Sequence, residues 1–148
     1  MSISVEFQKR IRELVDETEL KRIDIATKGN FNYHALSNAI VHGILPTTPT
    51  LVKMANYFNV SINYLLGKTN SNDFVENSNV PFKTRFEELC REKGVTHYKV
   101  ALDCFFDKSN ISHWLSKDYL PTLNILNMLC NYFKVSPDYL LDRSDFKN

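Results

Sequence analysis

The sequence predicts an all-α protein built from two tandem five-helix domains, and three observations support this prediction. The chain matches itself without a gap at an offset of 75 residues, most densely where residues 56–66 face residues 131–141. Apolar residues recur at the three- and four-residue spacing of an amphipathic helix, and no useful stretch alternates with the period of two that half-buried strands show. A fixed internal period of this kind indicates a duplicated structural unit.

The first predicted helix of each copy has its buried face at positions i, i+4, i+7 and i+8. These positions hold Phe82, Phe86, Leu89 and Cys90 in the second copy and Phe7, Ile11, Leu14 and Val15 in the first. Gly94 ends the second-copy helix, because glycine readily adopts the left-handed conformation found at helix C-termini. Thr96 can then cap the next helix, which contains Val100 and Ala101.

The third predicted helix lies near residues 32–41 in the first copy and 107–117 in the second. Asn32 and Asp107 can accept hydrogen bonds from the N–H groups at its start. Its apolar face holds Leu36, Ala39 and Ile40 in the first copy and Ile111, Trp114 and Leu115 in the second. Because Trp114 follows the helical phase of Ile111, it is predicted to be a core residue and not a base-stacking residue.

Two further helices complete each copy. Thr122, after Pro121, caps the fourth helix. Ser136 caps a short fifth helix with Pro137 at its first position, where a missing N–H costs nothing. The apolar residues of these helices are Leu51, Met54, Ala55, Phe58, Tyr64, Leu65 and Leu66 in the first copy, and Leu126, Leu129, Cys130, Phe133, Tyr139, Leu140 and Leu141 in the second.

A polar segment rich in Asn and Ser separates the two copies. We place the first domain at residues 1–68, the linker at 69–80 and the second domain at 81–148, because this composition is typical of connecting segments. An extended chain covers roughly 3.3 Å per residue, so the segment from 67 to 80 reaches at most about 46 Å. That length can join two domains side by side.

The net charge, the number of cysteines and the length of the apolar runs limit the classes of protein to which the chain can belong. The net charge is only +1, with eight basic and seven acidic residues in 1–75 and ten of each in 76–148, so a strong overall electrostatic attraction to nucleic acid is missing. Three cysteines, an odd number, favour a reducing compartment over a disulfide framework. No apolar run approaches the roughly 20 residues of a membrane span. We expect a soluble cytoplasmic protein that does not interact with membranes.

The two copies resemble the phage-repressor and Cro type of helix-turn-helix domain, the XRE-like family. In the second copy the resemblance lies in Ala101, in residues 111–114 and in the run from Pro121 through residues 131–141. In the first copy it lies in Ala26, Leu36-Ser37-Asn38, Leu45-Pro46-Thr47 and residues 56–66. The terminal run is the most specific part.

The resemblance implies that the third helix enters the major groove of DNA while the second lies across the backbone. The residues implied to contact bases are Lys108, Ser109, Asn110 and His113 in the second copy and Tyr33, His34 and Asn38 in the first. Those implied to contact phosphate are Arg22, His42, His97 and Lys117. Lys108 suits guanine and Asn110 suits adenine. Because the two sets differ, a chain that uses both would read two unlike half-sites.

We therefore expect a sequence-specific regulator of transcription, a repressor, that binds double-stranded DNA. Its repeats would act as an intramolecular pseudo-dimer, or the chain would form a homodimer. The alternative is a protein-interaction or dimerisation module with the same fold, favoured by the near-neutral charge and by the uncharged third helix of the first copy. No cofactor or small-molecule substrate is expected.

Two chemical alternatives rest on weaker patterns. A zinc site formed by Cys90, His97, Cys104 and His113 lacks paired ligand spacing and has no counterpart in the first copy, so buried core cysteines are the preferred interpretation. The sequence contains neither a pair of acid–base residues nor a nucleophile in a triad-like context, so we do not expect an enzyme.

Overall fold

The computed structural model describes residues 2–74, 76 and 80–148. Within these residues all regular elements are helices, apart from one isolated antiparallel bridge between Ile3 and Ile44. The all-α prediction is thereby confirmed. The chain divides into two compact units, Met1–Val75 and Glu76–Asn148, called unit 1 and unit 2 below. Among the described helices, none combines the length and apolar character needed to cross a lipid bilayer.

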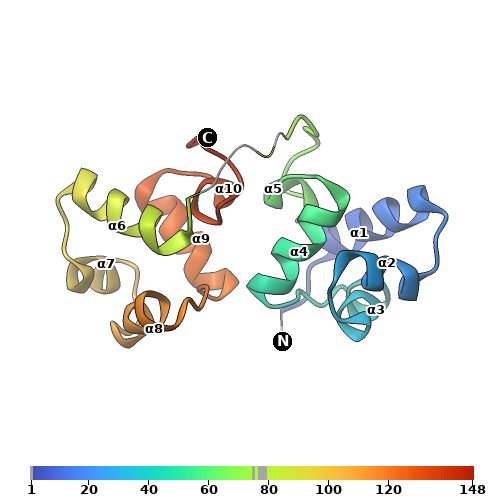
Figure 1. Ribbon diagram of the computed structural model, residues 1–148, viewed down its shortest axis with the longest axis horizontal. Helices are drawn as coiled ribbons and strands as arrows, with labels where there is room; N and C mark the ends of the chain where they lie inside the picture. The colour runs from blue at the N-terminus through green and yellow to red at the C-terminus, as the bar shows by residue number, and fades with distance from the viewer. Residues whose placement is uncertain (1, 75, 77–79) are drawn as a thin grey trace. The chain divides into compact units, whose positions relative to one another are not determined.

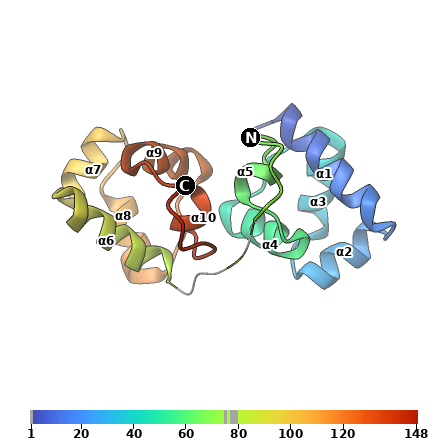
Figure 2. The ribbon, with the colours of Figure 1, turned by 90° about the horizontal axis from the view of Figure 1, so that it is seen from above.

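Unit 1 holds five of the helices. They are α1 (Val5–Thr18), α2 (Arg22–Gly29), α3 (Tyr33–His42), α4 (Thr48–Phe58) and α5 (Ile62–Leu65). Helix α3 packs against both α1 and α2, as both views show (Figures 1 and 2). Helices α4 and α5 pack against each other, and α5 also reaches α1. The first and last helices of the unit are therefore in contact.

Unit 2 holds the other five described helices in the same order. They are α6 (Phe82–Lys93), α7 (His97–Asp103), α8 (Ser109–Lys117), α9 (Leu123–Phe133) and α10 (Pro137–Leu140). Helix α10 packs against α6 and α9, which repeats the contact between the first and last helices of unit 1. The sequence offset of 75 residues thus corresponds to a repeated helix order.

Most helix starts have the caps that the sequence predicts. The side-chain oxygens of Asn32, Thr96, Thr122 and Ser136 each accept a hydrogen bond from the backbone N–H three residues later, at 3.1 to 3.4 Å. Thr47 precedes α4 but its side chain makes no such bond. Because α4 carries Pro49 in its first turn, one of the N–H groups that a cap would serve is absent.

The predicted apolar faces form the two cores. Phe7, Ile11 and Leu36 are fully buried in unit 1, and Phe86 and Leu140 in unit 2. Trp114 is 3% exposed. Its ring lies 5.5 Å, centroid to centroid, from each of its aromatic neighbours, Phe82, Phe86 and Phe106. The prediction that Trp114 is a core residue is confirmed.

An arginine on the first helix of each unit stacks on a tyrosine of the last. The guanidinium carbon of Arg10 lies 3.8 Å from the Tyr64 ring centroid, and that of Arg85 lies 4.0 Å from the Tyr139 ring centroid. Arg10 Nη1 also donates to the Thr69 carbonyl at 3.2 Å, and its Nη2 donates to Asn70 Oδ1 at 3.0 Å. Residues 69 and 70, which we assigned to the linker, therefore pack on unit 1.

The turn before α3 and the turn before α8 each contain a residue in the left-handed conformation, but the two residues differ. It is Asn30 (φ 57°) in unit 1 and Phe105 (φ 61°) in unit 2. Gly29 lies inside α2, where a Cβ atom would come within 2.2 Å of the Phe31 ring. Gly29 therefore permits close packing of Phe31, and Asn30 makes the turn. Phe105 is 89% exposed.

Candidate nucleic-acid interface

The residues of α3 that we predict to contact bases, called reading residues below, are exposed to solvent. Leu36, Ala39 and Ile40 are buried and fix the helix on its unit. Tyr33, His34 and Asn38 are exposed. The rings of Tyr33 and His34 lie edge to face, with their centroids 5.6 Å apart. Gly43 (φ 69°) then ends the helix in a left-handed conformation. The exposed side chains of α3 therefore offer hydrogen-bonding groups, and the helix contains no Lys, Arg, Asp or Glu.

Helix α8 presents a more basic surface. Ile111 and Trp114 anchor it, while Lys108, Ser109 and His113 are exposed. The N-cap of α8 is Lys108, one residue after the predicted Asp107, and its side chain makes no cap bond. Asp107 Oδ1 instead accepts a hydrogen bond from the backbone N–H of Ser109 at 2.8 Å. Hydrogen bonds from the backbone and side chain of Ser109 lower the pKa of Asp107, so its carboxylate is ionised at neutral pH.

Three of the predicted base-contacting residues in unit 2, Ser109, Asn110 and His113, already have contacts within the protein. Asn110 is partly exposed, and its Nδ2 donates to the backbone carbonyl of Asp107 at 2.9 Å. The ring of His113 lies 6.2 Å from that of Tyr119, centroid to centroid. Contact of Asn110 or of Ser109 with a base thus requires exchange of a local hydrogen bond to Asp107.

Near the start of α2, unit 1 places two arginines beside each other. Arg22, a predicted phosphate contact, lines a shallow hollow together with Arg12, Asp16 and the end of α3. Arg12 Nε donates to the Ile40 carbonyl at 2.8 Å, so this side chain also ties α1 to α3. We did not predict Arg12 from the sequence, because the residue has Glu87 as its counterpart and no repeated pattern marks it. His42, the last residue of α3, is exposed.

The corresponding region of unit 2 has a different charge. His97 is half-buried at the start of α7, and its Nε2 contacts the carboxylate of Glu87. This predicted phosphate contact therefore faces an acidic group of its own unit. Lys117, in the last turn of α8, is exposed. Positive charge thus lies on and before α8 in unit 2, and on α1 and at the start of α2 in unit 1.

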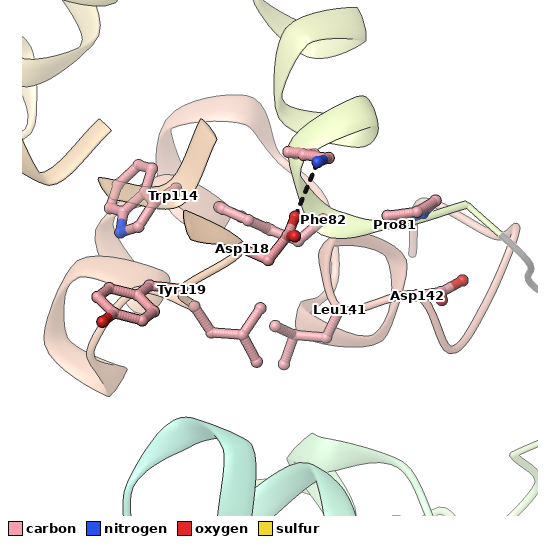
Figure 3. A pocket seen from close by; sticks show the side chains of 9 residues that line it. Pro81, Phe82, Trp114, Asp118, Tyr119, Leu141 and Asp142 are labelled. Atoms are coloured by element: carbon pink, nitrogen blue, oxygen red, sulfur yellow. Dashed lines mark ion pairs between the residues drawn. The ribbon is translucent and has the colours of Figure 1, made fainter. Parts of the chain in front are cut away.

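A separate apolar hollow of about 300 Å³ lies at the C-terminal end of α8 (Figure 3). Trp114, Tyr119 and Leu141 line it, and an ion pair of 2.8 Å between Lys83 Nζ and Asp118 Oδ1 crosses its edge. In unit 1 the extended residues 2–4 lie along the equivalent loop. There the backbone N–H of Ser4 donates to the Gly43 carbonyl at 2.9 Å. The hollow is at the opposite end of α8 from Lys108.

The four residues of the alternative zinc site do not come together as a group. Within the described part of the chain, the clustered potential ligands are Cys90, His97 and Glu87. Cys104 is buried elsewhere, with its Sγ 3.9 Å from the Met128 carbonyl oxygen. All three cysteines are buried and none forms a disulfide, which agrees with their predicted place in the core.

Comparison of the chain with models of protein families, with curated proteins and with solved structures found no match.

Proposed function

We propose that the chain is a sequence-specific regulator of transcription, acting as a repressor, that binds double-stranded DNA through α3 and α8. One observation carries this proposal. In each unit a helix of nine or ten residues buries one face in the core and exposes the polar residues of its first turn. A helix presented in this way fits the major groove, where base edges are read from the N-terminal end of the helix.

In this proposal the two units contact DNA with different kinds of residue. In unit 2, Lys108 and Ser109 supply donors to base edges, and each good base contact is worth about 1 to 3 kcal/mol of discrimination. In unit 1, Tyr33 and Asn38 read bases while Arg12 and Arg22 contact phosphate. The operator would then contain two unlike half-sites, because the exposed residues of α3 and α8 differ in charge and in shape.

Selection of binding sites from random duplexes tests this proposal directly. We expect the whole chain to enrich one sequence, and log affinity to fall with log salt concentration by about 0.9 per phosphate neutralised. The double variant Lys108→Ala with Asn110→Ala should relax the preference at a few adjacent positions while leaving the far-UV circular dichroism spectrum unchanged. No enrichment from random duplexes at low salt would overturn the proposal.

The matched control for these variants is Lys134→Asn. Lys134 is exposed and ends α9 in a left-handed conformation (φ 57°), and its counterpart in unit 1 is Asn59 (φ 55°). This substitution removes one positive charge from unit 2 without removing a reading residue. It should weaken binding slightly for all duplexes and leave the selected sequence unchanged.

Protein interaction is the second candidate function, and α7 supplies the observation that favours it. Tyr98 and Leu102, four residues apart on α7, are 62% and 56% exposed, and Phe105, in the turn after α7, is 89% exposed. Exposed apolar patches are typical of interaction surfaces. If this candidate is correct, wild-type protein self-associates in sedimentation velocity without DNA, and Phe105→Asn reduces that association. A monomer at all concentrations, together with selective DNA binding, would leave only the first function.

A further inference from the structure

Three side chains of different metal-binding types converge where α6 passes into α7. Glu87 and Cys90 lie three residues apart on one face of α6, and His97 is the first residue of α7. A carboxylate oxygen, the Cys90 Sγ and an imidazole nitrogen all lie within 4.8 Å of one another. We propose that these three residues bind a divalent transition-metal ion of the zinc type, a property separate from the proposed DNA binding.

The backbone between the two helices is fixed by its own hydrogen bonds. Gly94 adopts a left-handed conformation (φ 71°), and the next N–H, that of Val95, donates to the Cys90 carbonyl at 3.0 Å. Thr96 then caps α7 by accepting a hydrogen bond from the Lys99 N–H at 3.1 Å. The position of His97 opposite α6 is thus set by the fold, so few degrees of freedom need to be lost when an ion binds.

The ligand set matches the chemistry of zinc. Thiolate, imidazole and carboxylate are its usual protein ligands, and sites with three protein ligands leave a fourth position for water or another molecule. Cys90 is 5% exposed, whereas Glu87 and His97 lie at the rim of an open hollow that Arg91 and Lys108 also line. The ion would therefore have the buried sulfur on one side and solvent on the other.

Two features of these side chains bear on how an ion would bind. The Glu87 carboxylate already contacts Nε2 of His97, so two of the three ligands are close together before binding. Burial, with the charge of Glu87, raises the pKa of the Cys90 thiol to about 11. The metal–sulfur bond would form as the thiol proton leaves to solvent, because the thiolate is the form that binds metal.

The positions of unit 1 that match these three residues hold no metal-binding side chains. At the corresponding positions unit 1 has Arg12, Val15 and Arg22, which offer two cations and an apolar group. Unit 1 therefore has the same order of helices with valine where unit 2 has Cys90. This comparison also supplies a variant, Cys90→Val, that removes the thiolate while keeping a buried apolar side chain.

Titration of the reduced, chelator-treated whole chain with Co²⁺ tests the proposal. We expect saturable binding of one ion per chain, with thiolate-to-cobalt charge-transfer absorption in the near ultraviolet and visible bands typical of a tetrahedral site. Excess Zn²⁺ should remove these bands by competition. Cys90→Val should abolish the charge-transfer absorption. His97→Gln or Glu87→Gln should weaken binding by about tenfold or more, since even loss of an outer-shell partner has this effect.

The control is Cys130→Ala, which removes another buried thiol and introduces the residue that unit 1 has at the matching position, Ala55. It should leave the cobalt spectrum unchanged. Absence of a thiolate band in the wild-type chain, or a band that survives Cys90→Val, would overturn the proposal and identify Glu87 and His97 as a simple hydrogen-bonded pair. Because no DNA is present, failure here says nothing against DNA binding, and failure to select a DNA sequence says nothing against metal binding.

Discussion

Truncation of Phe86 to alanine should nearly unfold unit 2 while leaving unit 1 folded. Phe86 is fully buried. Its ring centroid lies between 5.5 and 6.2 Å from those of four neighbours, Phe82, His97, Trp114 and Phe133. Replacement of a core phenylalanine by alanine costs about 3 to 5 kcal/mol, because the cavity is added to the lost transfer free energy.

This cost is comparable to the total stability of the unit. Unit 2 spans residues 76–148, and a domain of this size has a free energy of unfolding of about 4 to 11 kcal/mol. A small domain loses about 1 kcal/mol of stability per molar urea. The urea midpoint of unit 2 should therefore fall by about 3 M or more. If the wild-type unit has a stability of about 4 kcal/mol, the variant is partly unfolded even without urea.

Tryptophan fluorescence measures this change selectively, because Trp114 is the single tryptophan of the chain and packs against Phe86. Phe86→Ile, which introduces the residue found at the matching position of unit 1, should shift the midpoint much less. Ile11→Ala in unit 1 should alter the far-UV circular dichroism transition and leave the fluorescence transition in place. A fall of less than about 1 M for Phe86→Ala would contradict this account of the unit 2 core.

Two further predictions concern unit 2. Phe105→Asn should raise the free energy of unfolding by about 1 kcal/mol, because asparagine tolerates the left-handed conformation better than an aromatic residue and Phe105 is 89% exposed; an unchanged or lower urea midpoint would contradict it. Hydrogen bonds from Tyr132 and Lys99 lower the pKa of Asp103, so its contribution to stability should be present above the unfolded pKa of about 3.9 and be lost as the pH falls through the lower folded value. In an NMR titration Tyr132→Phe should raise the pKa of Asp103, and an unchanged pKa would show that this hydrogen bond has no such effect.

Local signals explain why the helices could be predicted. A capping side chain such as Thr96 or Ser136 acts within three residues, and an apolar face depends on spacing within one helix. Because the chain is duplicated, each position could also be compared with its counterpart in the other copy. Trp114 was correctly assigned to the core because it shares the helical phase of Ile111, although unit 1 has only Ala39 at that position.

Contacts between helices were not predictable in the same way. The approach of Glu87 to His97 depends on the path of the turn at Gly94, and it has no counterpart in unit 1 that could have marked it. Likewise, the hydrogen bond from Arg12 to the Ile40 carbonyl joins two helices far apart in sequence. The reading residues were assigned by resemblance alone, so their exposure agrees with the assignment but their contacts with DNA stay a prediction.

The stacked arginines determine where the chain can be divided for experiments on single halves. A fragment that ends at residue 68 deprives Arg10 of its bonds to Thr69 and Asn70, although its side chain stays against Tyr64. A second fragment needs its last residues for the same reason, because Arg85 is bonded to Asp145. Loss of an activity in a shorter fragment could then reflect damage to the helix bundle, so division after Val75, at the boundary between the two units, is the appropriate choice for comparing the halves.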